Sequence, residues 1–209
     1  MAEIIIDAGS GNSCKNDLFY VKRMLDELKA VDTGKHNITV KWQLFKQAGD
    51  NIPLNHLTFD HAYRYAEMLG YKTTASVFDI DSLKFLLNYD VPMIKIANNR
   101  DLDYLIGEMP RKIPVYRSCA SGREWGKNYN SLNMICVSKY PATVEEYEDA
   151  FEIAHLLDFG WGISDHITDF TLWHKYQPEI YEVHFKLEDS TGLDAGPFSR
   201  TPEQLKEIL

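Results

Sequence analysis

The sequence predicts an α/β fold, a compact (β/α)8 TIM barrel, and three observations carry this prediction. Short apolar runs alternate with longer amphipathic ones along all 209 residues, and strands that alternate with helices pair in parallel through right-handed crossovers. The chain contains eight such units, the number that closes a barrel, and its length lies at the compact end of the range for such barrels, about 200 to over 400 residues. A doubly wound open sheet is the alternative, but no glycine-rich dinucleotide loop follows the first strand.

The expected strands are short apolar runs bounded by polar or turn residues. They are Glu3–Ile6, Ile38–Phe45, Tyr71–Ser76, Pro92–Ala97, Ile113–Arg117, Asn133–Val137, Phe159–Ile163 and Ile180–Phe185. In the second of them, Lys41 and Gln43 share one face, opposite Val40, Trp42 and Leu44, because successive side chains of a strand alternate between its two faces.

Helical patterns with capping residues connect these strands. Asp17 is suited to cap the first helix, Thr143 with Glu146 forms a capping box for a later one, and Thr201 precedes Pro202 at the start of the last. The expected helices are 17–29, Thr58–Leu69, Asp79–Leu87, Asp101–Glu108, 143–157, Thr168–Gln177 and Pro202–Leu209.

Composition and charge limit the functional classes. A net charge of −9 argues against nucleic acid as a partner, because that affinity rests largely on Lys and Arg at phosphates; a local basic pocket for a small anion stays open. Cys14, Cys119 and Cys136 show no metal-type spacing and favour a reduced, cytoplasmic setting. No signal peptide or apolar run of about 18 residues is found, so no membrane association is expected.

No internal repeat, low-complexity run or linker interrupts the pattern, so the chain is interpreted as one domain, 1–209. The Gly-, Asn- and Ser-rich stretch Ser118–Asn130 is expected to be a loop with at most one helical turn. Cys136 is interpreted as a small buried side chain and not as a nucleophile, because no histidine lies beside it in the sequence.

Two histidines stand at the ends of the last two expected strands. His166 follows the run that ends at Ile163, and His184 lies inside the run that ends at Phe185. In parallel α/β architecture, chemistry is built at the carboxyl ends of the strands. Two imidazoles that meet there could hold one divalent metal and leave positions open for substrate. The alternative is two unrelated histidines, one hydrogen-bonded in the core and one on a loop.

Polar side chains gather at or just beyond the carboxyl ends of the strands. They are Asp7, Lys41, Gln43, Ser76, Lys95, Asn98, Ser118, Ser138, Tyr140, Ser164, His166 and His184. Lysines inside apolar strands are costly to bury without an anionic partner. Lys41 and Lys95, together with the serines, therefore favour a site for a phosphate or carboxylate, and Lys95→Met is expected to remove ligand binding and could raise thermal stability. Alternatively each lysine reaches solvent or pairs with an acid such as Asp7.

Seven short motifs follow one another along the chain. They are Ile-Ile-Ile-Asp-Ala-Gly at Ile4–Gly9, Val-Lys-Trp-Gln at Val40–Gln43, Ala-Ser-Val-Phe-Asp at Ala75–Asp79, Val-Pro-Met-Ile-Lys-Ile-Ala at Val91–Ala97, Ser-Lys-Tyr-Pro at Ser138–Pro141, Gly-Ile-Ser-Asp-His at Gly162–His166 and Glu-Val-His-Phe at Glu182–Phe185. Taken in this order and at this spacing, they resemble the sialic acid synthase family. The catalytic barrel of that family condenses phosphoenolpyruvate with N-acetylmannosamine or a related sugar.

The resemblance implies a (β/α)8 barrel and assigns roles to residues by position. His166 and His184 would bind a divalent metal, Mn²⁺ or Mg²⁺, and would be catalytic together with Asp7 and Lys95. The residues that would bind phosphoenolpyruvate are Lys41, Ser76, Lys95, Asn98, Ser118, Ser138 and Ser164. Those that would face the sugar are Asp7, Gln43, Tyr140 and Asp194. The implied partners are phosphoenolpyruvate and an amino-sugar, and the sequence leaves open whether the chain forms a homodimer.

The chain departs from the family pattern mainly in the half of the site that would face the sugar. Asp7 replaces the glutamate usual after the first strand, Gly11–Ser13 replaces an Asn-His pair, and Ser138 stands where asparagine is expected. Arg100 occupies the position of an acid; it is expected either to turn away toward a neighbouring acid or to enter the site and select an acidic sugar. The sequence ends before the antifreeze-like domain that usually follows in the family.

Three hypotheses of function remain. The first is an enzyme that joins phosphoenolpyruvate to a sugar aldehyde with release of phosphate. The second is a barrel that binds an anionic ligand without synthase activity, which Arg100 would favour. The third is another metal-dependent aldolase or lyase on the same scaffold, since a fold alone does not define a function.

Overall fold

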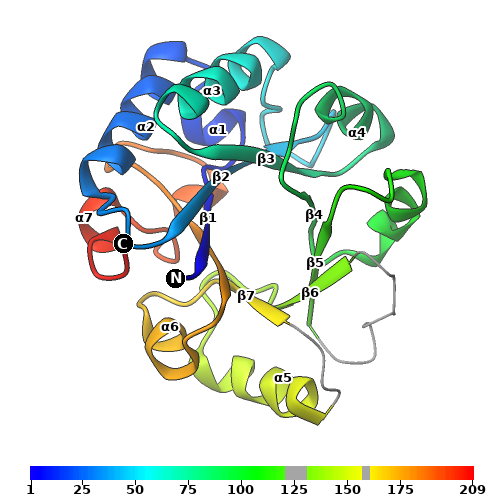
Figure 1. Cartoon of the computed structure of the whole chain (residues 1–209), viewed down its shortest axis with the longest axis vertical. Helices are drawn as coiled ribbons and strands as arrows, with labels where there is room; N and C mark the ends of the chain where they lie inside the picture. Colours follow the sequence, from blue (N-terminus) through cyan, green and yellow to red (C-terminus); the bar gives the residue numbers. More distant parts are fainter. Residues whose placement is uncertain (121–130, 157–160) are drawn as a thin grey trace.

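The computed structural model describes residues 1–120, 131–156 and 161–209, and it confirms the (β/α)8 barrel (Figure 1). Eight parallel strands lie in the order of the sequence and close through pairing of the last strand with the first. This closure excludes the doubly wound open sheet. The strands are β1 (Glu3–Asp7), β2 (Asn37–Leu44), β3 (Lys72–Val77), β4 (Ile94–Ile96), β5 (Val115–Cys119), β6 (Ser131–Cys136), β7 (Trp161–Asp165) and β8 (Ile180–His184).

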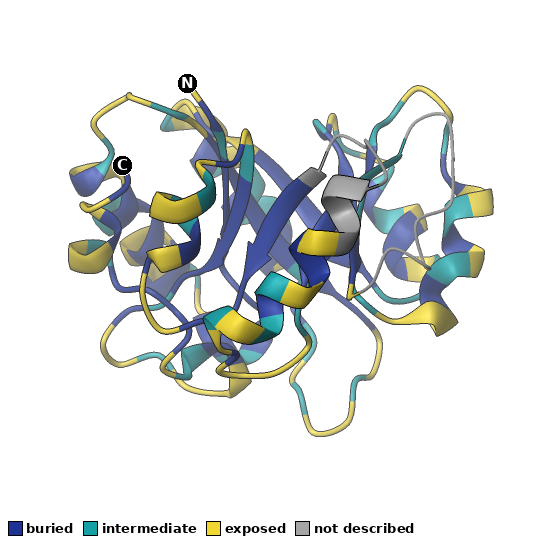
Figure 2. Ribbon diagram, turned by 90° about the horizontal axis from the view of Figure 1, so that it is seen from below, coloured by how far each residue is buried: buried dark blue, intermediate teal, exposed yellow. Residues whose placement is uncertain are grey.

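Helices surround the strands, and their exposed residues lie on the outside while the strands are buried (Figure 2). They are α1 (Gly11–Cys14), α2 (Leu18–Val31), α3 (His56–Met68), α4 (Ile80–Leu86), η1 (Arg100–Glu108), α5 (Val144–Leu156), α6 (Thr171–Tyr176), η3 (Leu193–Ala195) and α7 (Pro202–Leu205), where η denotes a 3-10 helix. Two of the predicted caps are present: Asp17 accepts hydrogen bonds from the first turn of α2, and Thr201 forms a capping box with Gln204. Of the predicted box at the start of α5, the structure shows the bond from the Thr143 main-chain nitrogen to Glu146.

Several boundaries differ from the prediction. The helix expected at Asp101–Glu108 is a 3-10 helix, α6 begins only at Thr171, and the last helix ends at Leu205. Asp169 accepts a hydrogen bond from the main-chain nitrogen of Thr171, which explains the later start of α6. Parts of three further predictions, the loop at residues 121–130, the helix end at 157 and the strand start at 159–160, fall outside the described residues.

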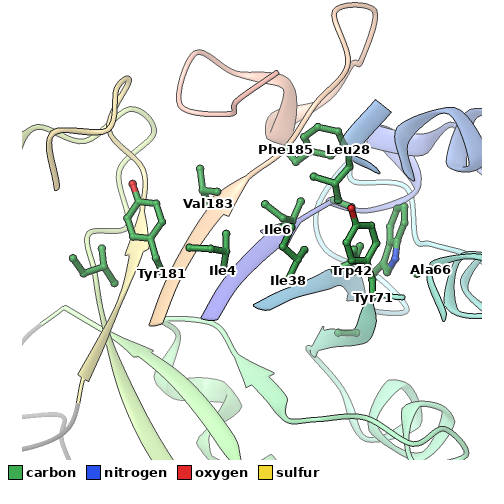
Figure 3. Close-up of a cluster of buried hydrophobic side chains, with 14 of the residues drawn as sticks. Ile4, Ile6, Leu28, Ile38, Trp42, Ala66, Tyr71, Tyr181, Val183 and Phe185 are labelled. Atoms are coloured by element: carbon green, nitrogen blue, oxygen red, sulfur yellow. The ribbon is translucent and has the colours of Figure 1, made fainter. Parts of the chain in front are cut away.

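The alternation of side chains in β1 shows how the barrel is filled. Ile4 and Ile6 point outward into the main apolar core between strands and helices (Figure 3). Ile5 belongs to a separate small cluster with Met93 and Met134, inside the barrel. Because successive side chains alternate, Asp7 shares the inward face with Ile5 and lies at the carboxyl end of the strand.

The strand register places charged residues next to one another at that end. Asp7 is the partner of Lys41 on β2 and of His184 on β8. Ser76 on β3 is likewise opposite Lys95 on β4. The closure of the barrel between β8 and β1 therefore brings the two ends of the sequence into one polar site.

The described helices include none with the length and apolar character needed to cross a lipid bilayer.

Candidate active site

A cavity of about 200 Å³ opens at the carboxyl ends of the strands, and every site residue predicted from the sequence lines it. The predicted residues are Asp7, Lys41, Gln43, Ser76, Lys95, Asn98, Ser118, Ser138, Tyr140, Ser164, His166, His184 and Asp194. Other described residues also contribute, chiefly Glu182 and Cys136 at the inner end and Phe45, Phe78 and Leu193. Sequence positions from 7 to 194 thus meet in one place.

Lys41 is buried and lies between two carboxylates. Its ammonium nitrogen is 2.7 Å from Asp7 Oδ2 and 3.8 Å from Glu182 Oε1, and it donates a hydrogen bond of 2.9 Å to Ser76 Oγ. Burial acts to lower the pKa of Lys41, but Asp7 and Glu182 outweigh it and raise the pKa above its ordinary value. Lys41 is therefore a fixed ammonium group at the inner end of the cavity.

Lys95 occupies the equivalent place on the other side of Glu182. It donates hydrogen bonds to Ser118 Oγ at 2.7 Å and to Glu182 Oε1 at 3.2 Å. Ser164 donates to the same carboxylate oxygen at 2.9 Å. Both lysines line the cavity as predicted. The alternative, in which each lysine pairs with an acid, also holds in part, because Lys41 pairs with Asp7 and Lys95 with Glu182.

Glu182 is the main residue that the sequence analysis did not assign to the site. Burial acts to raise its pKa, but Lys41 and Lys95 hold that pKa below the ordinary value, so it is a buried carboxylate. Its second oxygen, Oε2, is buried without a hydrogen-bond partner. The signal was present in the sequence, because residues 182 and 184 are two apart in a strand and share a face.

The two histidines converge as predicted, with ring centroids 5.2 Å apart. His166 Nδ1 donates a hydrogen bond of 2.6 Å to the main-chain oxygen of Val137, since a carbonyl can only accept. This bond leaves the lone pair on Nε2. Burial, with the nearby His184, lowers the pKa of His166 to about 3, so the ring is neutral near pH 7.

His184 lies among acidic side chains. Its Nδ1 is 3.2 Å from Asp194 Oδ1 and 3.5 Å from Asp7 Oδ2, although neither contact has hydrogen-bond geometry. Burial opposes the charged form of His184, but Asp7 and Asp194 raise its pKa above the ordinary value. Tyr140 packs against His166, with ring centroids 4.3 Å apart.

A hydrogen-bonded group of three side chains forms the part of the cavity predicted to face the sugar. Gln43 Nε2 donates to Asp7 Oδ2 and to Asp194 Oδ1, both at 3.2 Å. Asp194 is buried, and Ser13 Oγ lies 3.5 Å from its Oδ2. Asp194 belongs to the short η3 helix, so a residue far from any strand completes the site.

The rim of the cavity is more exposed. Tyr140 is 43% exposed, and Asn98 donates a hydrogen bond of 2.9 Å to Ser138 Oγ. Arg100 is exposed at the start of η1 and is not among the described residues that line the cavity. Of its acidic neighbours, Asp103 pairs with Arg117 at 2.8 Å.

Cys136 is buried as predicted, but the reason given from the sequence does not hold in space. Its Sγ lies 4.0 Å from His166 Nδ1, although the two residues are 30 positions apart. Burial raises the pKa of the Cys136 thiol, so it stays protonated at neutral pH. A nucleophilic role therefore remains disfavoured.

The nitrogen atoms at the centre of the site suit a metal ligand set. His166 offers a neutral Nε2, and His184 has an imidazole nitrogen, Nδ1, that is buried without a hydrogen-bond partner. Within the described ranges, no three His, Cys, Asp or Glu side chains are grouped closely enough to hold an ion by themselves. His166 and His184 could together supply two ligands and leave the other positions to substrate oxygen atoms.

The fold and the cavity define a (β/α)8 barrel whose polar centre lies at the carboxyl ends of its strands. Residues 20–209 match the model of the NeuB family. The chain therefore belongs to the NeuB family. No curated protein sequence matches it significantly.

Similar solved structures share the fold at low sequence identity. The chain is 21% identical to the N-acetylneuraminic acid (sialic acid) synthetase of Leptospira borgpetersenii serovar Hardjo-bovis, with a TM-score of 0.75, over 98% of this chain and 80% of that one. It is 21% identical to a spore coat polysaccharide biosynthesis protein of Bacillus subtilis, with a TM-score of 0.73, over 99% and 65%. A truncated 3-deoxy-D-arabino-heptulosonate 7-phosphate synthase of Thermotoga maritima is 12% identical, with a TM-score of 0.66, over 99% and 83%.

Proposed function

We propose that this chain condenses phosphoenolpyruvate with the aldehyde of an amino-sugar, such as N-acetylmannosamine, to give a sialic-acid-type product and inorganic phosphate. Membership of the NeuB family supports a synthase that makes a sugar acid. The observation that carries the proposal is the arrangement of two buried lysines, each bonded to a serine, beside two converging histidines in one cavity.

The lysines and hydroxyl groups form the half of the site that would bind phosphoenolpyruvate. Lys41 with Ser76, and Lys95 with Ser118, each offer an ammonium group and a hydroxyl toward a carboxylate or phosphate. In the absence of the ligand, Asp7 and Glu182 neutralise the two charges. A bound anion would share these ammonium groups with the acids, which keeps the substrate in one orientation.

The reaction forms one carbon–carbon bond and breaks one carbon–oxygen bond. Carbon 3 of phosphoenolpyruvate attacks the aldehyde carbon, whose oxygen takes up a proton and becomes a hydroxyl. Water adds to carbon 2, where positive charge develops, and phosphate leaves from that carbon. Glu182 lies beside both lysines, where its buried carboxylate would stabilise the positive charge at carbon 2.

Asp7, Gln43 and Asp194 would orient the sugar. Their mutual hydrogen bonds hold the carboxylates in place, and the cavity-lining Tyr140 and Leu193 lie at its exposed rim. His166 and His184 would hold the divalent cation, Mn²⁺ or Mg²⁺. When bound, the cation supplies Lewis-acid polarisation of the aldehyde oxygen.

The test is an assay of phosphate release by the purified chain with phosphoenolpyruvate and a panel of hexosamines. We expect release that depends on both substrates and on Mn²⁺ or Mg²⁺, with the product identified by mass spectrometry. Lys95→Met should abolish release, whereas Lys35→Met, on the exposed loop before β2, should not. If the chain binds phosphoenolpyruvate but releases no phosphate with any sugar, the synthase hypothesis is wrong and the chain is an anion-binding protein.

A further inference from the structure

Arg200 is a buried cation that the proposed reaction does not use. Its side chain is 1% exposed, and its guanidinium donates to three main-chain carbonyls: to Phe198 at 2.7 Å, Ile167 at 2.8 Å and Asp169 at 2.5 Å. Asp165 Oδ2 is 3.9 Å away, beyond hydrogen-bond distance. Burial of a cation without a closely bonded carboxylate is unfavourable, so the three carbonyl contacts need an explanation.

The contacts of Arg200 connect the segment after β7 to the end of β8, at the point where the pairing of these two strands ends. The pairing of β7 with β8 ends at Asp165 and Val183. His166 and His184 each lie one residue beyond this last pair, so the hydrogen bonds between β7 and β8 do not hold them relative to each other.

Arg200 connects the two segments beyond this last pair, through both its main chain and its side chain. Its main-chain nitrogen donates to the oxygen of His184 at 2.8 Å. Its guanidinium reaches the oxygen of Ile167, the residue directly after His166. One residue therefore bonds to the main chain of His184 and to that of Ile167, the neighbour of His166.

We propose that Arg200 is a positioning residue that sets the separation of His166 and His184. Its guanidinium contacts main-chain oxygens and not the imidazoles themselves. Arg200 is not among the described residues that line the cavity. The consequence for a divalent cation rests on the proposed function, because the separation determines whether both imidazoles reach one ion. A planar guanidinium suits this task, since it presents several N–H groups in fixed directions, which a lysine cannot reproduce.

Two variants and one control test the proposal. Arg200→Lys keeps the charge and loses the fork, and Arg200→Gly leaves a space that guanidinium can enter. Leu83→Ala is the control, because Leu83 is equally buried and lies on α4, which packs against β3 on another side of the barrel. All proteins are compared at a temperature where circular dichroism shows them folded.

The first measurement is the affinity for Mn²⁺ alone, from the electron paramagnetic resonance signal of the free ion. We expect both Arg200 variants to bind Mn²⁺ about 10- to 100-fold more weakly, as is typical when a group that orients a metal ligand is lost. Guanidinium should restore affinity in Arg200→Gly and methylammonium should not, while Leu83→Ala should match the wild type. Wild-type affinity in folded Arg200→Lys, or an equal loss in Leu83→Ala, would overturn the proposal.

The second measurement needs no metal. Nitrogen NMR of the imidazoles reports which ring nitrogen of His166 carries the proton, and Nδ1 is expected in the wild type. Arg200→Lys should shift the ring signals of both His166 and His184. If the wild type binds no Mn²⁺, the cation in the proposed function is wrong, and these spectra alone decide the role of Arg200: unchanged signals refute it.

Discussion

Lys95 and Glu182 form an ion pair of 3.2 Å in which both side chains are almost fully buried, 2% and 3% exposed. Removal of one partner from such a pair leaves an uncompensated charge, which typically destabilises a protein by about 3–5 kcal/mol. Glu182→Ala should therefore lower the free energy of unfolding by about that amount, as measured by urea denaturation. Glu203→Ala, which breaks an exposed pair with Lys206, should change it by less than about 1 kcal/mol. Equal effects would contradict the role of burial.

The same pair reverses one expectation from the sequence. The sequence suggested that Lys95→Met could raise thermal stability by deleting a buried charge, but the structure shows that this change removes the closer of the two ammonium groups beside the buried Glu182 and leaves only Lys41, at 3.8 Å. We now expect Lys95→Met to lower the free energy of unfolding by about 3–5 kcal/mol. The double variant Lys95→Met/Glu182→Leu should recover most of this loss, because replacement of a whole buried pair by apolar groups is often neutral or stabilising. A double variant less stable than both single variants would refute the pairing.

A variant of one histidine tests the cation site. His184→Ala should stay folded, since His184 lies at the cavity and not in the apolar core, but it should lose binding of Mn²⁺ and phosphate release. His174→Ala is the matched control, because His174 is exposed and pairs with Glu207 at 2.7 Å. Titration with Mn²⁺ followed by electron paramagnetic resonance measures the binding. Retention of wild-type affinity in His184→Ala would remove this residue from the ligand set.

Gly9 and Gly34 have similar backbone conformations but different surroundings. A comparison of alanine variants at the two positions therefore distinguishes the effect of backbone strain from the effect of contact with the site. Gly9 has φ +77° and Gly34 has φ +75°, a region that residues with side chains rarely adopt. A Cβ on Gly9 would lie 2.1 Å from Ser13 Oγ and 2.9 Å from Asp194 Oδ2, whereas one on Gly34 would meet nothing within 4 Å.

Gly9→Ala should therefore lower the free energy of unfolding by about 1–3 kcal/mol more than Gly34→Ala does, the usual effect of overpacking. It should also weaken the apparent affinity for the sugar, because Asp194 must move. Urea denaturation and the KM for the sugar provide the two measurements. An equal decrease in the free energy of unfolding in both variants would show that Ser13 and Asp194 move away from the added methyl group without loss of stability.

The cysteines provide a prediction about pH. Burial raises the pKa of the Cys14 thiol to about 11, and all three cysteines are buried. Since the thiolate is the reactive form, alkylation by iodoacetamide at pH 8 should be slow in the folded protein and should quicken as the pH rises toward 11. In urea all three thiols should react rapidly. Rapid labelling of Cys14 in the folded protein at pH 8 would contradict its burial.

The sequence identified candidate site residues where a polar residue interrupts an apolar strand or follows its end. Lys41, Lys95 and the serines at strand ends were found in this way, and the structure brings them to one cavity. The family resemblance supplied Asp194, which no periodicity could place because it lies on a short 3-10 helix.

Pairings between distant residues were less accessible. The position of Glu182 between Lys41 and Lys95 depends on the stagger of strands around a closed barrel. The contact of Cys136 with His166 and the ties made by Arg200 likewise depend on tertiary packing. Local pattern identifies which side chains face inward, but the stagger and the loops determine which of them touch.

The position of Asp7 between Lys41 and His184 places the site across the closure of β8 against β1. A growing chain can assemble β1 to β6 and still lack Glu182, both site histidines and Asp194. The chemical centre therefore comes into existence only when the final strand docks on the first. A partly folded form, however compact, therefore lacks this cavity, and the proposed activity requires the completed barrel.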